Sequence, residues 1–121
     1  MGLDMWICRK DSEFDYDSGI ECDDDKVIWW RNAHMIHNYM NKLFEGVQNY
    51  EEYTITLDEL KDLRNRCQEV FDNHSLAEEL LPDPLKYYDK TYFIVIKNTI
   101  ININNLIEQD NNDEYYYRAW W

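Results

Sequence analysis

The stretch that decides the predicted fold is DKVIWWRNAHMIHNYMNKLFEGV, which covers residues 25 to 47. Its apolar side chains recur at steps of four and three residues, the spacing that places side chains on one face of an α-helix. They are Trp29, Ala33, Ile36, Met40, Leu43 and Val47. Gly46 stands where such a helix would end. The spacing therefore predicts a long first helix from about Asp25 to Val47.

A second helix is predicted downstream of the first. Thr56 and Glu59 have the spacing of a capping box, in which a hydroxyl binds a free amide of the first turn and a glutamate reaches back. The apolar residues that follow keep helical spacing. They are Leu57, Leu60, Leu63, Cys67, Val70 and Phe71. One or two further turns are expected over residues 75 to 81, and the sequence Pro82-Asp-Pro84 ends them.

A third long helix is predicted from about Asp89 to Gln109. Its first half is rich in β-branched residues, which favour strands. The helical spacing nevertheless continues to Ile107 and decides for a helix. The residues that share its apolar face are Tyr92, Ile96, Ile100, Ile103 and Ile107.

Together these elements predict a mainly α fold. We expect a compact antiparallel bundle of three long helices plus a short one. A short strand near each terminus could be added, since residues 5 to 8 are apolar and flanked by charge. The whole chain, residues 1 to 121, is expected to form one domain. It would comprise an N-terminal strand and acidic loop to residue 25, a helical core from 26 to 110, and an aromatic tail from 111 to 121.

The composition narrows the classes of function. The chain has 25 acidic and 12 basic side chains and a net charge of −13, which argues against a broad surface for duplex DNA or an anionic membrane. An aromatic content of 16% is far too high for a disordered acidic tail. Cys8, Cys22 and Cys67 lack metal-site spacing and indicate reduced thiols. With no signal peptide and no bilayer-spanning stretch in the sequence, we expect a cytoplasmic protein.

The segment from Asp11 to Asp25 is strongly acidic. It fits a solvated loop that leads into a helix start, where aspartates suit the positive end of the helix dipole. The alternative is a metal-binding loop, because carboxylates are good oxygen ligands. The spacing matches no EF-hand, which needs acidic groups at alternate positions and a central glycine. No metal site is predicted.

The segment from Trp29 to Tyr39 holds the most unusual mixture of side chains, with indoles, an arginine, amides and two histidines. His34 and His37 could bind a metal ion or exchange protons, although metalloprotease spacing is absent. His37 could instead be a hydrogen-bonded residue in a half-buried seam, and the tryptophans could pack in a core. A third interpretation is a nucleotide-like ligand, whose base stacks on aromatic rings while Arg31 binds a phosphate.

The last seven residues, YYYRAWW, repeat this chemistry around Arg118. So many aromatic rings indicate an interaction, because large exposed apolar patches tend to have partners. They could pack against the bundle, pair with another subunit or cover a ligand. The chain has only three glycines and no glycine-rich phosphate loop, hydrolase elbow or zinc-protease motif, so no catalytic set and no cofactor is predicted.

The two aromatic and arginine-containing segments resemble a family of small, uncharacterised bacteriophage proteins. The resemblance covers roughly residues 25 to 121, including Leu80-Leu-Pro82 and the tyrosine-rich residues 87 to 92. The chain lacks the phenylalanine-rich, glycine-ended segment expected after Pro82. The matching positions are Trp30, Arg31, Ala33, Ile36, His37 and Tyr39, then Tyr115, Tyr116, Tyr117 and Trp120. The resemblance implies a phage origin, hence an infected bacterial cell.

Small phage proteins with aromatic pockets include some that sequester the nucleotide signals of bacterial immunity. By this analogy we expect an anti-defence protein, a homo-oligomer that binds a cyclic ADP-ribose derivative or a cyclic dinucleotide without catalysis. Neither duplex DNA nor a membrane is an expected partner. The predicted ligand-binding residues are Trp30, Arg31, His34, His37, Asn38, Tyr116, Arg118 and Trp120.

Two other functions remain open from the sequence. An acidic protein inhibitor could block a basic or nucleic-acid-binding surface of a host protein, as the net charge of −13 suggests. A hydrolase of nucleotide signals could use His34 and His37.

Overall fold

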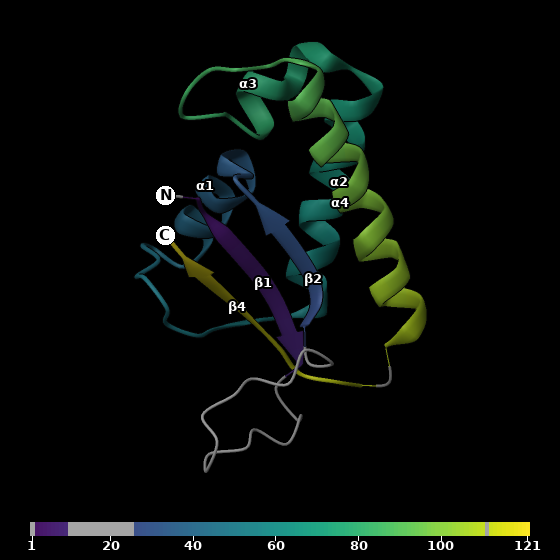
Figure 1. The fold of residues 1–121 in the computed structure, drawn as a ribbon. Helices are drawn as coiled ribbons and strands as arrows, with labels where there is room; N and C mark the ends of the chain where they lie inside the picture. Colours follow the sequence, from purple (N-terminus) through teal and green to yellow (C-terminus); the bar gives the residue numbers. More distant parts are fainter. Residues whose placement is uncertain (1, 10–25, 111) are drawn as a thin grey trace.

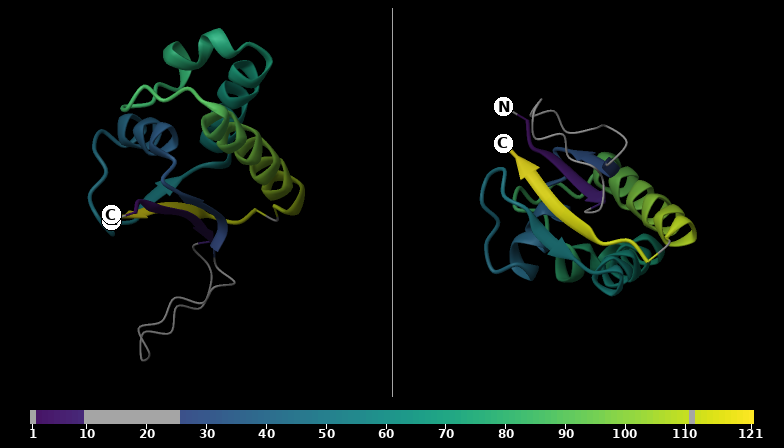
Figure 2. Two further views of the ribbon diagram at one scale, coloured as in Figure 1. Left: turned by 45° about the horizontal axis from the view of Figure 1, so that its top comes forward. Right: turned by 90° about the horizontal axis from the view of Figure 1, so that it is seen from below.

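The computed structural model describes residues 2 to 9, 26 to 110 and 112 to 121. The predicted acidic loop, Asp11 to Asp25, lies outside the described residues. The described parts form a four-stranded antiparallel sheet with helices on one side (Figures 1 and 2).

The strand order in the sheet is β2-β1-β4-β3. The strands are β1 (Asp4–Arg9), β2 (Lys26–Arg31), β3 (Tyr53–Ile55) and β4 (Tyr115–Trp120). The first and last strands of the chain therefore pair in the middle of the sheet, and both termini lie close together in Figure 1. The C-terminal segment, expected as a tail, is a central strand whose Tyr115, Tyr117 and Ala119 are buried.

The helices all lie on the same face of the sheet, as the left view of Figure 2 shows. They are α1 (His34–Leu43), α2 (Leu57–Asp72), α3 (Ala77–Leu80) and α4 (Lys90–Gln109), with a 3-10 turn at His74–Leu76. The helices α2 and α4 pack side by side. Among the described residues, no helix combines the length and the apolar character needed to cross a bilayer.

The predicted helical bundle is wrong, because the structure is an α/β fold with a four-stranded sheet. The error lies in the predicted helix over 25 to 47. Its first part is strand β2, and the helix begins only at His34. The backbone changes direction at Asn32, which has a φ of 56°. The Asn32 N–H donates to the Leu3 carbonyl at 2.6 Å, and the Leu3 N–H donates to Asn32 Oδ1 at 2.8 Å.

The physical reason is that β2 consists of residues that favour strands and has a partner elsewhere in the chain. Val27, Ile28, Trp29 and Trp30 are β-branched or aromatic. They pair with β1, some 20 residues earlier, with Met5 opposite Trp30. Spacing within one segment cannot reveal such a partner.

The other predicted elements agree with the structure. The helix α2 begins at the predicted capping box, in which Glu59 N–H donates to Thr56 Oγ1 at 3.1 Å and Thr56 N–H donates to Glu59 Oε1 at 2.9 Å. The helix α4 covers the range predicted from its spacing, and Asp89 caps its start. Strand β1 contains the apolar residues 5 to 8.

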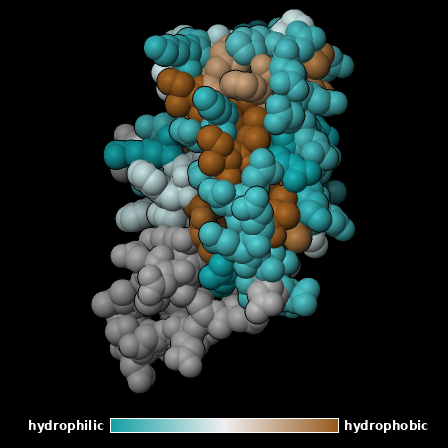
Figure 3. All heavy atoms as spheres, turned by 90° about the vertical axis from the view of Figure 1, so that its right-hand side faces the viewer, coloured by the Kyte–Doolittle hydropathy of each residue, from teal (hydrophilic) through white to brown (hydrophobic). Residues whose placement is uncertain are grey.

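The outer side of α4 carries exposed apolar side chains. Ile94 and Ile101, two turns apart, are both exposed. In Figure 3, apolar patches form a broken stripe along this side of the molecule, and hydrophilic residues lie on both sides of the stripe. The opposite side of α4 packs into the core through Ile96, Ile100 and Ile103.

Candidate functional site

The two faces of the sheet have different surroundings. On the face toward the helices, the indole N–H of Trp30 donates to Thr99 Oγ1 of α4 at 2.9 Å, and Tyr117 Oη lies 2.8 Å from His37 Nδ1 of α1. Because side chains alternate along a strand, their neighbours point the other way. We call this other surface the open face. Its residues are Asp4, Trp6, Cys8, Trp29, Arg31, Thr54, Tyr116, Arg118 and Trp120.

The strand register arranges the open face in rows across the sheet. Asp4 of β1 stands opposite Arg31 of β2 on one side and opposite Trp120 of β4 on the other. We call these three residues the Arg31 row. In the next row, Trp6 stands between Trp29 and Arg118. The pairing thus brings the arginine of the first predicted segment and a tryptophan of the second into one row.

The exposed part of the open face is at this end of the sheet. Trp29 and Trp120 are 56% and 53% exposed, and Arg31 is exposed too. Cys8 and Tyr116, further along the same face, are buried. A ligand from solution can therefore reach the Arg31 row and Trp29 directly.

Arg31 differs from the other arginines of the chain. Within the part of the chain that the structure describes, no hydrogen bond or ion pair holds its guanidinium. By contrast, Arg66 Nε lies 3.1 Å from Asp62 Oδ2, and Arg118 Nη2 lies 2.8 Å from Glu52 Oε1. In a chain of net charge −13, an exposed arginine without a carboxylate partner is a candidate anion site.

Arg31 also stands where hollows of the surface meet. One hollow of about 410 Å³ lies between β2 and α4 and includes Trp29, Asn98 and Asn102. Another, of about 370 Å³, includes Arg31 and His34 and faces the loop before α4. A Cβ built on Gly2 would lie 3.3 Å from the Arg31 Nε, so a larger residue there would displace the Arg31 side chain by a few tenths of an ångström.

Aromatic rings surround the end of the Arg31 row at which Trp120 lies. A hollow of about 230 Å³ is lined by Gly2, Asp4, Trp120 and Trp121. Tyr50 meets Trp120 edge to face, with ring centroids 5.6 Å apart. Its ring also lies 4.9 Å from the guanidinium carbon of Arg118. Tyr50 therefore contacts the Trp120 ring at this end of the Arg31 row and the guanidinium of Arg118 in the next row.

The structure brings some of the predicted ligand-binding residues together and separates others. Arg31, Tyr116, Arg118 and Trp120 share the open face, and His34 lines a hollow with Arg31. Trp30 is buried against α4 on the opposite face.

His37 and Asn38 lie away from the open face. His37 contacts Tyr117 and Trp121, and Asn38 donates to the carbonyl of Pro82 at 3.3 Å. Asp4, Trp29 and Tyr50 were not among the predicted residues. Alternation along β2 would have placed Trp29 beside Arg31.

His37 is held in a half-buried position between α1 and β4. Burial, and next the nearby His34, lower the pKa of His37 below its ordinary 6.5. A neutral imidazole suits the contact with the Tyr117 hydroxyl, because Nδ1 can then accept a hydrogen bond. No three metal-ligating side chains gather within residues 2 to 9, 26 to 110 and 112 to 121.

The lowered pKa of His37 predicts a pH dependence of stability. The folded state binds fewer protons than the unfolded state between the folded pKa and 6.5, so the free energy of unfolding rises with pH in this interval. Stability is therefore lost as the pH falls below about 6.5 toward the folded pKa. Urea unfolding between pH 7.5 and 5 should show a steeper loss in the wild type than in His37→Gln. Equal slopes would contradict this assignment.

A comparison of the chain with protein-family models, curated proteins and solved structures finds no match. The candidate site therefore stands on the geometry and chemistry of these residues.

Proposed function

We propose that this protein binds a small, nucleotide-like anion at the Arg31 row and holds it without chemical change. The observation that carries the proposal is the row itself. An exposed arginine with no polar partner among the described residues stands two strands from an exposed tryptophan, on one face of one sheet.

The spacing within the row suits a nucleotide. Adjacent strands lie about 4.8 Å apart, so the backbones at Arg31 and Trp120 are about 10 Å apart across β1. Both side chains are long enough to lean toward each other. A phosphate on Arg31 and a base against Trp120 can then belong to the same nucleotide. Stacking of a base on an aromatic ring contributes about 1–3 kcal/mol.

Asp4 gives the row a polar centre. It stands between Arg31 and Trp120 and has no hydrogen bond or ion pair within the described ranges. A carboxylate accepts hydrogen bonds from ribose hydroxyls and from base N–H groups. It would also repel a phosphate at that position, so a phosphate of the ligand is expected at Arg31 and not at the centre of the row.

The cellular role we propose is the sequestration of an immune signal by a phage protein. The resemblance to phage proteins supports a cyclic ADP-ribose derivative or a cyclic dinucleotide as the ligand. Binding alone suffices for this role, which fits a site made of one arginine, one carboxylate and aromatic rings. Self-association is also part of the proposal, and light scattering coupled to size-exclusion chromatography tests it.

A thermal-shift screen at fixed protein concentration tests the proposal. The ligands are cyclic di-AMP, cyclic di-GMP, cyclic ADP-ribose and AMP, with adenosine as the control that lacks a phosphate. A ligand that binds only the folded state at 100 times its Kd stabilises it by about 2.7 kcal/mol and raises the Tm by several degrees. We expect such a rise for at least one phosphate-bearing ligand and none for adenosine.

The bound ligand is then recovered after the protein is denatured. Chromatographically unchanged ligand supports sequestration, and a cleaved product contradicts it in favour of a hydrolase. If no nucleotide raises the Tm, while a basic protein partner binds with a steep salt dependence, the acidic inhibitor becomes the better account.

A further inference from the structure

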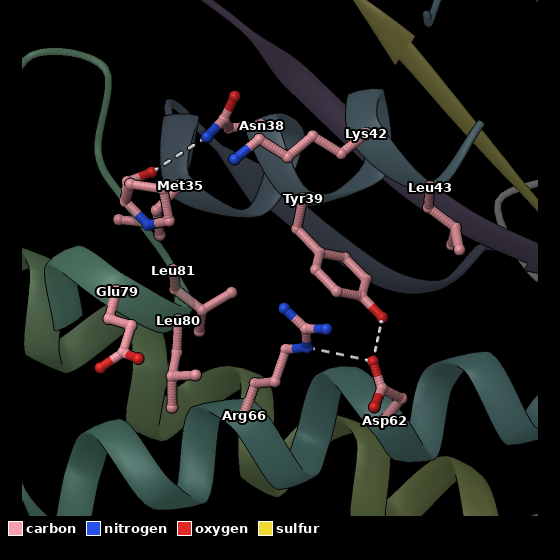
Figure 4. Close-up of a pocket in the computed structure, with 11 residues that line it drawn as sticks. Met35, Asn38, Tyr39, Lys42, Leu43, Asp62, Arg66, Glu79, Leu80 and Leu81 are labelled. Atoms are coloured by element: carbon pink, nitrogen blue, oxygen red, sulfur yellow. Dashed lines mark hydrogen bonds and ion pairs between the residues drawn. The ribbon is translucent and has the colours of Figure 1, made fainter. Parts of the chain in front are cut away.

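A further hollow lies on the helix side of the sheet, between α1 and the helices α2 and α3 (Figure 4). Its volume is about 320 Å³, within the usual range of small-molecule pockets. Much of its wall is apolar, with contributions from Met35, Leu43, Leu80, Leu81 and Pro82. None of these residues belongs to the open face, so this hollow is separate from the Arg31 row.

Hydrogen bonds and a cation–π contact position the guanidinium of Arg66 in this hollow. Tyr39 Oη donates to Asp62 Oδ2 at 2.7 Å, and Arg66 Nε donates to the same oxygen at 3.1 Å. The guanidinium carbon of Arg66 also lies 5.3 Å from the centre of the Tyr39 ring. Burial, followed by the bond to Asp62, raises the pKa of Tyr39, so this phenol stays a donor.

The terminal amino groups of Arg66 remain available. Neither of them makes a hydrogen bond in the part of the chain that the structure describes. Figure 4 shows them pointing up from α2 into the space below α1. Because Asp62 and Tyr39 hold the guanidinium on one side, its free edge is oriented before any ligand arrives.

Lys42 supplies a second cation to the same hollow. Its side chain extends along α1 over the hollow in Figure 4, and the described residues hold no polar partner for its ammonium. The wall also contains two carboxylates. That of Asp62 accepts hydrogen bonds from Tyr39 and Arg66, and that of Glu79 lies at the other end of the hollow in the same view. The two cationic groups that lack a polar partner among the described residues, the free edge of Arg66 and the ammonium of Lys42, therefore lie on opposite sides of the hollow.

We propose that this hollow binds a small organic monocarboxylate with an apolar body. The carboxylate would lie between the free edge of Arg66 and the ammonium of Lys42, where charge-assisted hydrogen bonds are strong. The apolar body would lie against Met35, Leu80 and Leu81. This site is independent of the proposed nucleotide function, because the two share no residue.

The test uses the whole protein, labelled with nitrogen-15, and follows its amide and arginine Nε signals by NMR. The ligands are phenylacetate and hexanoate, and the control is phenylacetamide, which has the same shape without the charge. Ligands of about ten heavy atoms are expected to bind with a Kd near the millimolar range. We expect shifts at Arg66 and around residues 38 to 42 and 80 to 82, and about tenfold weaker binding of the amide.

Two variants complete the test. Lys42→Ala, an exposed change that leaves the fold intact, should weaken phenylacetate binding about fivefold to tenfold, and Arg66→Gln should do so at least as strongly. Lys97→Ala, another exposed helical lysine, loses the same charge far from the hollow and should bind as the wild type does. The proposal is overturned if the amide binds as tightly as the acid, if Lys97→Ala weakens binding as much as Lys42→Ala, or if the shifts lie outside the hollow.

Discussion

Replacing Trp30 by alanine is expected to lower the free energy of unfolding by about 3–5 kcal/mol. The side chain is only 5% exposed and packs between the sheet and α4. Its indole N–H donates to Thr99 Oγ1, which in turn donates to the carbonyl of Val95 at 2.8 Å. Trp30→Ala therefore leaves a large cavity and removes the hydrogen bond that the buried Thr99 hydroxyl accepts. Urea unfolding followed by circular dichroism measures the loss.

The neighbouring residue provides the matched control. Trp29 has the same side chain on the same strand but is 56% exposed on the open face, so Trp29→Ala should cost less than about 1 kcal/mol. A helix over residues 25 to 47 would reverse this order, because its apolar face would contain Trp29 and leave Trp30 beside it. If Trp29→Ala proved the more destabilising change, the strand assignment of β2 would be wrong.

Replacing Arg31 by alanine is expected to weaken nucleotide binding by about 10- to 100-fold. A hydrogen bond to a charged group contributes about 1.5–3 kcal/mol, and each 1.4 kcal/mol is a factor of ten in Kd. Arg31 is exposed and makes no polar contact with the described residues, so the free energy of unfolding should change by less than about 0.5 kcal/mol. Calorimetric titration of the two proteins measures the effect.

Arg64→Ala is the matched control for this prediction. Arg64 lies on α2, where it donates to Asn65 and Asn104, and its removal changes the net charge by the same amount. A general effect of charge on an anionic ligand would weaken binding equally in both variants. A specific contact weakens it in Arg31→Ala alone. Arg31→Lys should fall between the wild type and Arg31→Ala, because an ammonium cannot bind a phosphate through two parallel bonds.

The helices α2 and α4 could be predicted from the sequence because their signals are local. The capping box at Thr56 and the apolar spacing from Tyr92 to Ile107 lie within the segments that they describe. Strand β2 carries a misleading local signal, since Trp29, Ala33 and Ile36 happen to stand at helical spacing. What makes it a strand is pairing with β1, and that contact crosses a segment of about 16 residues.

The candidate site could be predicted only in part, for a related reason. The sequence identifies two segments in which aromatic rings surround an arginine, and the structure places them on either side of β1. Which side chains meet depends on the register, because a shift of one residue moves every side chain to the other face. Trp30 therefore belongs to the core and Trp29 to the surface, although the two are adjacent in sequence. Asp4 and Tyr50 join the site through tertiary pairing alone.

The most direct test of the central claim is an NMR titration of nitrogen-15-labelled protein with the nucleotide that gives the largest Tm shift. Substitution of each tryptophan by phenylalanine assigns the indole N–H signals. We expect the signals of Trp120 and of the Arg31 Nε to shift, while that of Trp30, buried and bonded to Thr99, keeps its position. Shifts that leave Trp120 and Arg31 unchanged would contradict a ligand site at the Arg31 row.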